Sequence, residues 1–567
     1  MAQQKSKRHK FIFIIGGVMS GVGKGVASAS IAKILQSRGL SVSSIKIDPY
    51  LNVDAGTMNP IEHGEVFVLS SGLECDQDMG NYERFLDVEI PHENYMTNGM
   101  IFKAVIDRER NLGYGGACVE PTFHISQEII NRVYASAQLT HADVTVVEIG
   151  GTVGEYQNAI FIEAARIMKL KHANDVLFAL VSYLPIPGTI GEMKTKPTQN
   201  AVRTLNSYGV HPDVIIARGS YPLDEKRKMK IGDMCSIPHK NIISAPDVPN
   251  IYEVPLNFDH DGLTDILVRA LRLRSQKQSD LSLWKKIIER SKKSDIQVRI
   301  AMIGKYFKTG DYVLSDVYLS IIESLKHASY HLDCHIEIEW IDSQKFEKNP
   351  LSVDELKQYD GILVPGGFGG RGIEGIMHGI RYARTHHIPY FGICYGMQLA
   401  LIEYARNEMK FEGAHTTEVS KKTPYPVVDI MPDQAAFIRE NRYGGTMRLG
   451  SYVAHLKTGS LAYKWYSSAA EGRWTDRSAK QQHIIKERHR HRYEVNPQYI
   501  SRFENAGIVF SGVSPDKVLM EIMELPSTVH PFFIGTQFHP EFTGSVVHPH
   551  PLFTGFLDAA CKRKSRT

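Results

Sequence analysis

Short apolar runs alternate with longer amphipathic stretches along the first 270 residues. The apolar runs are residues 11–15, 42–47, 144–149, 176–181 and 214–217. Because these runs are almost continuously hydrophobic, they predict strands buried on both faces of a parallel sheet. Residues 27–38 have helical periodicity and are followed by Gly39, a residue typical of helix ends. This alternation predicts an α/β domain.

A polar stretch separates this region from a second alternation of the same kind. Residues 271–296 are rich in Arg, Lys, Ser and Gln and predict a connecting helix and linker. Beyond them we expect strands at 298–304, 335–341, 361–367 and 389–393, with a helix over 312–330. The chain is therefore predicted to be α/β with two doubly wound domains, residues 1–270 and 297–567. Residues 451–477 between later elements predict a surface-exposed loop or hairpin.

Composition narrows the class of protein. With 567 residues, 43% hydrophobic and 23% charged, the chain can bury a large core, which excludes a disordered or disulfide-stapled protein. A net charge of +4 gives no sign of a nucleic-acid or membrane-surface partner. Six cysteines without a CxxC pair favour a reducing compartment, and we expect a cytoplasmic protein. The basic start resembles a signal peptide, but its five-residue apolar run is too short, so a buried first strand is preferred.

A strand, a Gly-rich turn and a helix follow one another in FIFIIGGVMSGVGKGVASAS. Backbone N–H groups of such a turn, with the positive end of the helix dipole, bind phosphate oxygens, and Lys24 would reach the terminal phosphates. The match to the phosphate-loop pattern is imperfect: Gly17 lies six residues before Gly23, and Gly25 replaces the usual Ser or Thr. A tight turn without a ligand is the alternative. The complete order of strand, lysine and helix favours phosphate binding.

Two acidic positions are candidates for a Mg²⁺ site. We expect Glu148 to end the strand VTVVEIGG, at the carboxyl edge of the sheet where ligands bind. Asp76 and Asp78 stand in the stretch SSGLECDQDMG, which predicts a loop. Mg²⁺ usually takes one or two carboxylates together with water and phosphate. For Asp76, a merely solvated carboxylate is an equally good interpretation.

A third segment, GEMKTKPTQ, combines two lysines with Thr and Gln side chains. Such a loop offers ammonium and amide donors for phosphates and for a base or sugar. Lysines in a loop are usually only solubilising, so the residues alone leave both interpretations open.

The second region contains a cysteine between two glycines, in PYFGICYGMQ. This is the nucleophile-elbow pattern with Cys394 in place of serine, and a following helix favours the thiolate. His539 and Glu541 in FIGTQFHPEF would complete a Cys–His–Glu triad. Gly366 and Gly367, at the end of a predicted strand, would offer N–H groups for an oxyanion hole. A buried structural cysteine and a structural histidine are the alternatives.

Taken together, these motifs closely resemble the CTP synthases, a family that joins an amidoligase domain to a class I glutamine amidotransferase domain. The resemblance covers nearly the whole chain. Its carriers are GGVMSGVGKG, SIKIDPYLNVDAGTMNPIEHGEVFV, EIGGTVGE, GEMKTKPTQ, PGGFGGRG, GICYGMQ, GGTMRLG, RHRHRYEVN and QFHPEF. GICYGMQ alone is typical of any glutamine amidotransferase, whereas KTKPTQ with DPYLNVDAGTM points to the enzyme that converts UTP to CTP.

The resemblance implies a reaction. ATP would phosphorylate the 4-oxygen of UTP, and ammonia released from L-glutamine and transferred between the domains would displace the phosphate. Mg²⁺ would accompany ATP, GTP would activate the enzyme, CTP would inhibit it, and the chain would form homotetramers that often stack into filaments. No nucleic acid or membrane is expected.

The resemblance also implies roles for residues. The turn would cradle ATP phosphates through Gly21, Val22, Gly23, Lys24, Gly25 and Val26. UTP would contact Ser20, Lys194, Thr195, Lys196, Pro197, Thr198, Gln199 and Lys230. Lys24 and Lys46 would stabilise the transferring phosphoryl group, while Asp78 and Glu148 would hold the metal ion. Gly367, Gln398, Glu418 and Arg492 would bind glutamine.

One segment departs from the family pattern. After EIGGTVG the family usually has Asp-Ile-Glu, but this chain has Glu155, Tyr156 and Gln157. The segment contacts CTP in relatives. We therefore predict that inhibition by CTP is weakened or altered while catalysis persists.

Two rival hypotheses remain. Cobyrinic acid amide synthases have similar domains but act on carboxylates, and the GEMKTKPTQ loop argues against them. A structural filament or nucleotide sensor with decayed chemistry is the other, but Lys24, Cys394, His539 and Glu541 are all present.

Overall fold

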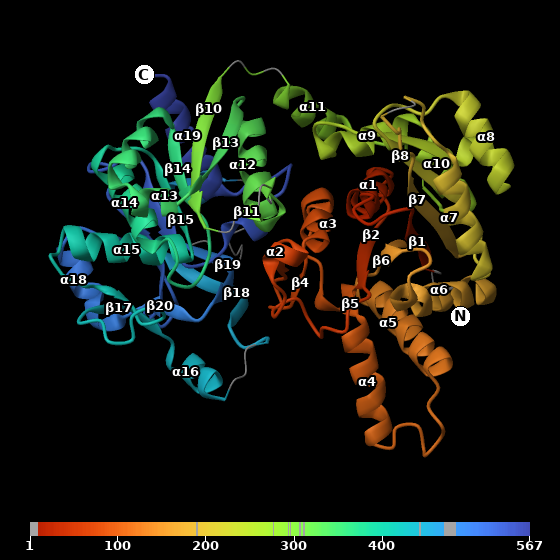
Figure 1. The fold of residues 1–567 in the computed structure, drawn as a ribbon, viewed down its shortest axis with the longest axis horizontal. Helices are drawn as coiled ribbons and strands as arrows, with labels where there is room; N and C mark the ends of the chain where they lie inside the picture. Colours follow the sequence, from red (N-terminus) through yellow and green to blue (C-terminus); the bar gives the residue numbers. More distant parts are fainter. Residues whose placement is uncertain are drawn as a thin grey trace, which may run out of the picture. The chain divides into compact units, whose positions relative to one another are not determined.

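The computed structural model describes residues 9–188, 191–275, 277–292, 294, 296–305, 308–309, 312–313, 315–440, 444–469 and 483–566. The chain folds into two compact units (Figure 1). Unit 1 comprises Met1–Ala55 and Asp78–Lys286, and unit 2 comprises Gly56–Gln77 and Ile287–Thr567. That residues 1–270 and 297–567 are two separate domains stays a prediction.

Unit 1 is built on a parallel sheet of seven strands in the order β5-β2-β6-β1-β7-β8-β9. All five predicted apolar runs are strands of this sheet. Its strands are β1 (Lys10–Gly17), β2 (Val42–Asp48), β5 (Tyr95–Thr97), β6 (Val144–Thr152), β7 (Val176–Tyr183), β8 (Val214–Gly219) and β9 (Ile242–Pro246). They are almost wholly buried, as continuous apolar runs require.

Helices cover both faces of this sheet, because successive side chains of each strand point to opposite sides. Phe11, Phe13 and Ile15 belong to a large core cluster with apolar side chains of the helices α4 to α8. The helices α3 and α9 pack against α1. The helices are α1 (Lys24–Ser37), α3 (Asp78–Leu86), α4 (Asn98–Arg110), α5 (Ser126–Leu139), α6 (Ala159–Lys171), α7 (Lys196–Ser207), α8 (Glu225–Cys235), α9 (Val254–His260), α10 (Leu263–Ala270) and α11 (Ser282–Ser291).

Unit 2 is built on a nine-stranded sheet in the order β13-β10-β14-β15-β23-β22-β21-β18-β19. The pairs from β13 to β23 are parallel and those from β23 to β19 are antiparallel. The strands are β10 (Gln297–Gly304), β13 (His335–Asp342), β14 (Gly361–Val364), β15 (Tyr390–Ile393), β18 (Arg448–Leu456), β19 (Ile484–His491), β21 (Val509–Val513), β22 (Met520–Glu524) and β23 (Phe533–Thr536). A smaller sheet joins β16 (His415–Thr416), β17 (Pro426–Ile430) and β20 (Tyr493–Val495).

This sheet also has a core on each face. Neighbouring residues of β10 alternate between the two: Ala301 and Ile303 lie in one cluster, Ile300 and Met302 in the other. The first cluster includes α14 (Ile373–Thr385) and α15 (Tyr395–Asn407), and the second includes α12 (Leu319–His331) and α19 (Pro551–Lys564). The shorter helices are α2 (Pro60–His63), α13 (Gln344–Lys348), α16 (Pro432–Arg439), α17 (Leu461–Ser468) and α18 (Ile500–Asn505). The doubly wound prediction therefore holds for both units.

Some predicted elements are corrected. The helix expected over 312–330 begins only at Leu319, because β12 (Tyr312–Val313) pairs with β11 (Lys308–Thr309) and a 3₁₀ turn (Ser315–Tyr318) precedes α12. The loop or hairpin expected over 451–477 is in part strand β18 and helix α17, and residues 470–482 lie outside the described residues. The hairpin β3 (Val66–Val68) and β4 (Glu74–Asp76) belongs to unit 2, which no sequence pattern indicated.

None of the helices in the described ranges is long and apolar enough to cross a membrane. All six cysteines are free thiols.

Candidate active sites

The Gly-rich turn links β1 to α1 as predicted. Gly21 and Gly23 have φ values of 70° and 84°, in the left-handed region where a Cβ is strained. A Cβ on Gly23 would also lie 2.4 Å from Nη1 of Arg218. The turn leaves Ser20 and Gly21 exposed and buries Val22, Lys24 and Gly25. Its end meets the N-terminus of α1, where free N–H groups favour anions.

Lys24 lies at the end of this turn and is buried. Its ammonium donates to the carbonyl of Gly151 at 2.8 Å. Burial lowers the pKa of Lys24, and the nearby Glu148 and Asp78 carboxylates oppose that shift. The lysine therefore faces the two predicted metal-binding acids.

Lys46 brings these two acids together. Its ammonium donates to Glu148 Oε1 at 2.9 Å and also pairs with Asp78. Burial raises the pKa of Glu148 although Lys46 opposes it, and Tyr82 donates its hydroxyl hydrogen to the same carboxylate. For Asp78, burial acts to raise the pKa, but Lys46, Asn81 and Lys24 together outweigh burial and the pKa is lowered. The predicted residues Lys24, Lys46, Asp78 and Glu148 thus form one charged cluster.

The donor set of this cluster fits Mg²⁺. Within the described ranges, no group of three or more His, Cys, Asp and Glu side chains forms a metal site. Two carboxylates are what Mg²⁺ takes when water and substrate phosphates supply the other ligands. Asp78 and Glu148 are therefore the residues that would hold the ion.

Three details of the sequence interpretation are wrong here. Glu148 does not end its strand, since β6 continues to Thr152 with an irregularity in its pairing to β1. Asp76 and Asp78 are not in a loop: Asp76 ends strand β4 and Asp78 begins helix α3. Asp76 belongs to unit 2 and Asp78 to unit 1.

A pocket beside the turn was not predicted. Its volume is about 350 Å³, and its lining includes Gly23, Val26, Arg218, Asp247, Val248 and Phe258. Arg218 donates to the carbonyl of Val22 at 3.1 Å and forms an ion pair with Asp247 at 2.5 Å. The lining comes from the turn, β8, the loop after β9 and α9, so no single motif could have revealed it. Its place next to the predicted phosphate-binding turn suits the nucleoside part of a nucleotide.

The segment Lys194–Gln199 is only partly the loop that was expected, because α7 begins at Lys196 with Pro197 in its first turn. Lys194 pairs with Glu192 at 2.6 Å and Lys196 is exposed. Thr198 and Gln199 are buried and bond within the unit: Ser182 donates to Thr198, and Gln199 donates to Thr195. Exposed Lys230 on α8 contributes to the lowered pKa of Glu192, after the larger effect of Lys194, so it lies near this segment.

The departing segment after β6 is also in unit 1. Glu155 Oε1 accepts from the backbone N–H of Thr152 at 2.8 Å and from its hydroxyl at 2.6 Å. Gln157 donates to Glu155 Oε2 at 2.8 Å, and Tyr156 is 98% exposed. Glu155 is thus a structural carboxylate of the turn, and Tyr156 presents its ring to solvent.

Unit 2 forms the predicted nucleophile elbow. β15 ends at Ile393, α15 begins at Tyr395, and Cys394 between them has φ 50° and ψ −96°. A Cβ on Gly396 would lie 2.4 Å from the carbonyl oxygen of Val364, so the turn requires glycine there. This strained backbone is the local feature that the Gly-x-Cys-x-Gly spacing predicted.

The elbow lies near the predicted base. His539 Nδ1 is 2.7 Å from Glu541 Oε1. Burial alone would lower the pKa of His539, but Glu541 and Cys394 raise it to about 10. Its Nε2 has no hydrogen-bond partner among the described residues. A Cβ on Gly366 would lie 2.9 Å from His539 Cε1, so the first of the two predicted oxyanion glycines borders the imidazole. A thiolate–imidazolium pair oriented by a carboxylate is the arrangement of a cysteine nucleophile.

The residues predicted to bind glutamine also lie in unit 2. Glu418 accepts from the N–H of Gly369 at 2.8 Å, and burial raises its pKa. Arg492 donates to Gln434 at 2.7 Å. Burial raises the pKa of Tyr493, and the charges of Glu418 and Arg492 also reach it, so both lie near that ring. Gln398, in the first turn of α15, donates to the carbonyl of Tyr493 at 2.9 Å.

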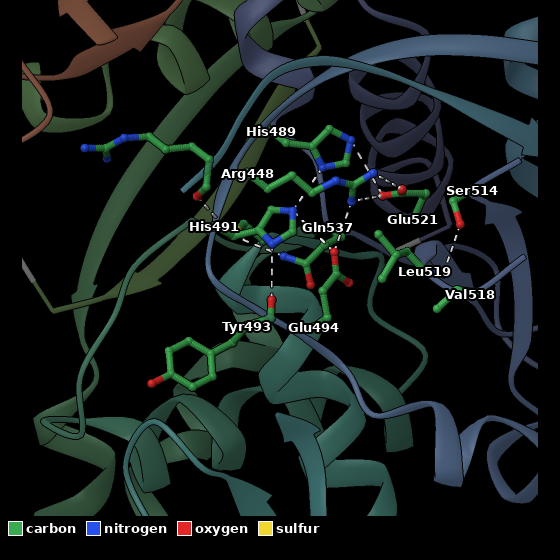
Figure 2. Close-up of polar contacts among 12 residues, drawn as sticks. Arg448, His489, His491, Tyr493, Glu494, Ser514, Val518, Leu519, Glu521 and Gln537 are labelled. Carbon is green, nitrogen blue, oxygen red and sulfur yellow. Dashed lines mark hydrogen bonds and ion pairs between the residues drawn. The ribbon is translucent and has the colours of Figure 1, made fainter. Parts of the chain in front are cut away.

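Sequence reasoning missed a buried polar network beside this site (Figure 2). Arg448 lies between two buried carboxylates, 3.0 Å from Glu494 and 2.7 Å from Glu521. His489 Nδ1 and His491 Nε2 are 3.0 Å apart, and burial lowers the pKa of both far below the usual value, so both are neutral. The alternation of Arg and His in RHRHR was the available signal: it puts the histidines on one face of β19 and the arginines on the other.

Comparisons with known proteins agree with this architecture. The family model described as CTP synthase N-terminus matches residues 10–273, and the model described as glutamine amidotransferase class-I matches residues 313–559. A CTP synthase of Thermococcus gammatolerans is 48% identical over 557 residues, which cover 98% of this chain and 99% of that protein. A CTP synthase of Methanosarcina barkeri is 45% identical over 558 residues, with the same two coverages.

A solved structure described as "Trypanosoma brucei CTPS - glutaminase domain with bound acivicin" is 34% identical, with a TM-score of 0.40, and covers 47% of this chain and 94% of that chain. The identities of 48% and 45% to the two CTP synthases, over 98% of this chain, are far beyond what a shared fold alone produces. The chain belongs to the CTP synthase family.

Proposed function

We propose that this chain is a ligase that makes CTP from UTP, ATP and glutamine. The observation that carries the proposal is the presence, in one chain of this family, of two different sites: a phosphate-binding turn beside paired carboxylates in unit 1, and a Cys–His–Glu site in unit 2. Each kind of site also occurs without the other. Together they suit a reaction in which the unit 2 site releases ammonia from glutamine and the unit 1 site uses that ammonia.

The unit 2 site hydrolyses glutamine. The Cys394 thiolate attacks the side-chain amide carbon, a C–S bond forms, and the C–N bond breaks as ammonia leaves with a proton from His539. Water, deprotonated by His539, then attacks the thioester and releases glutamate. Glu541 keeps the imidazole oriented and charged. The N–H of Gly367 stabilises the oxyanion, and Gln398, Glu418 and Arg492 bind the substrate.

The unit 1 site transfers phosphate and then amine. The ATP phosphates lie on the turn from Gly21 to Val26, and the nucleoside occupies the 350 Å³ pocket. The γ-phosphoryl group passes to the 4-oxygen of UTP with ADP as leaving group, and ammonia then attacks C4 and expels phosphate. Lys24 and Lys46 stabilise the charge of the transferring group. Mg²⁺ held by Asp78 and Glu148 would neutralise phosphate charge.

UTP is bound by Ser20, by Lys230 and by the segment from Lys194 to Gln199. The exposed ammonium groups suit its phosphates, while the buried Thr198 and Gln199 hold the start of α7 in place. Residues 1–270 and 297–567 are the two catalytic domains, and ammonia passes from the glutaminase site to the UTP site. GTP activates the enzyme and CTP inhibits it. The active form is a homotetramer able to stack into filaments, and the protein works in the cytoplasm.

Substituting the nucleophile separates the two activities. CTP formation from UTP, ATP and Mg²⁺ is measured with glutamine or with ammonium chloride, for the wild type and for Cys394→Ala. The variant is expected to lose glutamine-dependent synthesis and to keep ammonia-dependent synthesis. If the folded wild type makes no CTP from either nitrogen source, the proposed reaction is wrong.

A further inference from the structure

The thiol of Cys394 has a polar neighbour that belongs to neither the triad nor the oxyanion glycines. Nε2 of Gln537 lies 3.5 Å from Cys394 Sγ, within hydrogen-bond reach of a sulfur acceptor. Gln537 is fully buried, two residues before His539. Its backbone N–H donates to the carbonyl of Glu521 at 2.9 Å, which fixes the position of the residue.

Gln398, which contacts the other end of the Gln537 amide, decides which end of that amide faces the sulfur. Gln398 Nε2 lies 2.9 Å from the carbonyl oxygen of Tyr493, and a carbonyl can only accept, so Gln398 must present its amide nitrogen there. The same nitrogen lies 3.2 Å from Gln537 Oε1. With its oxygen engaged by that donor, Gln537 must turn its own nitrogen toward Cys394.

The carbonyl that starts this chain of bonds is itself held in place. Tyr493 begins β20 and pairs with Ile430 of β17. His491 Nδ1 lies 3.2 Å from the same carbonyl oxygen. Because His491 donates from Nδ1, its Nε2 is free to accept from His489 Nδ1 at 3.0 Å. Figure 2 shows Gln537 beside these two histidines and Tyr493. The direction of every donor is therefore fixed from the histidine pair to the sulfur.

We propose that Gln537 is a further catalytic residue of the glutaminase site: its amide N–H holds the Cys394 thiolate, and Gln398 is the positioning residue that aims it. This inference rests on the proposed role of Cys394. The N–H group satisfies one lone pair of the sulfur and leaves another directed at the substrate. His539 stays available to deliver its proton to the leaving ammonia instead of bonding the thiolate alone.

The test uses Gln537→Met, which keeps the length and volume of the side chain and removes its donor. Because a hydrogen bond to a charged group contributes substantial free energy, its loss should lower kcat/KM for glutamine hydrolysis about 10- to 100-fold. The loss should fall on kcat, because the Gln537 amide N–H contacts the sulfur, and Gln537→Met removes that donor while the predicted glutamine ligand Gln398 stays in place. Alkylation of Cys394 by iodoacetamide at neutral pH should slow as well.

Alkylation separates this role from a structural one. Cys394 is only 5% exposed, so a loosened site would expose the thiol and leave alkylation unchanged or faster. Ser511→Ala is the matched control: this hydroxyl is fully buried in unit 2 and has no hydrogen-bond partner in the part of the chain that the structure describes, so its removal should change neither rate. Unchanged kcat and unchanged alkylation in Gln537→Met would overturn the proposal.

A second variant keeps the test decisive if Gln537→Met does not fold, which ammonia-dependent CTP synthesis would reveal. In Gln398→Met the Gln537 amide can rotate, and we expect a smaller loss of kcat and slower alkylation. The KM for glutamine should rise with the loss of Gln398 as a ligand, but the kcat of the double variant should be no lower than that of Gln537→Met, because both substitutions act on kcat through one bond. Additive losses would contradict the coupling. If Cys394→Ala keeps glutaminase activity, the proposed function is wrong. If Cys394→Ala loses that activity but Gln537→Met changes neither kcat nor the alkylation rate, only this inference is wrong.

Discussion

The carboxylate of Asp78 occupies the space that a side chain at Gly25 would fill. A Cβ built on Gly25 would lie 1.8 Å from Asp78 Oδ1. Gly25 stands where the phosphate-loop pattern has the Ser or Thr that ligates Mg²⁺. In this chain the missing hydroxyl is thus replaced by a carboxylate from the first residue of α3. The motif lacks the hydroxyl residue at position 25 because the Asp78 carboxylate needs that space.

Gly25→Ala should therefore disable the unit 1 site. The methyl group must push Asp78 away from Lys46 and Glu148, and misplacement of about 1 Å can cost about 100-fold in rate. We expect CTP synthesis to fall about 100-fold with glutamine and with ammonium chloride alike, while glutamine hydrolysis continues.

Gly262→Ala is the control for that change. Gly262 is also in unit 1, and a Cβ there meets nothing within 4 Å, although its φ of 81° disfavours alanine. It should lose only about 1 kcal/mol of unfolding free energy and keep full activity. Normal synthesis in Gly25→Ala would contradict the assignment of Asp78.

Arg218 should matter for ATP and not for UTP. It lines the 350 Å³ pocket and donates to the carbonyl of Val22 in the turn. Loss of a charged hydrogen-bond donor predicts that Arg218→Ala raises the KM for ATP about 10- to 100-fold and leaves the KM for UTP unchanged. Steady-state kinetics with each nucleotide varied measures this. Arg166→Ala, which removes a surface pair with Glu163, should change neither constant.

The pH profile of glutamine hydrolysis should report His539. Although burial lowers its pKa, Glu541 and Cys394 raise it to about 10, so the imidazolium persists from neutral pH up to that value. Activity that needs this proton should fall only as the pH rises through about 10. Glu541→Gln removes the negative charge, so the decline should begin at lower pH and kcat should drop about 10²- to 10⁴-fold. An unshifted alkaline limb in the variant would show that His539 is not the proton donor.

Inhibition by CTP should be weak or altered in this chain. Where the family has a carboxylate, Gln157 presents an amide that donates to Glu155, and Tyr156 next to it is exposed. Gln157→Glu restores the family's charge and should change the CTP inhibition curve while leaving kcat for synthesis near the wild-type value. Identical CTP sensitivity of the two proteins would contradict this prediction.

Local sequence patterns predicted well those features that depend on neighbouring residues. The buried strands of unit 1, the turn from Gly21 to Lys24 and the elbow at Cys394 all follow from runs of apolar residues or from glycine spacing. Prediction of element boundaries failed at two places. Tyr312 pairs with Thr309 in a short hairpin instead of joining a helix, and Asp78 starts a helix instead of lying in a loop.

By itself, the sequence determined the α/β class of both halves, the presence of a Gly-rich turn and a cysteine elbow, and the resemblance that points to the family. Only the tertiary structure decided which side chains meet. It brought Lys46 between Asp78 and Glu148, assembled the pocket around Arg218 from separate segments, and set Gln537 against Cys394. The physical reason is that backbone conformation responds to nearby residues. Charge pairing, burial and hydrogen-bond direction instead depend on residues that are far apart in the chain and become neighbours only after folding.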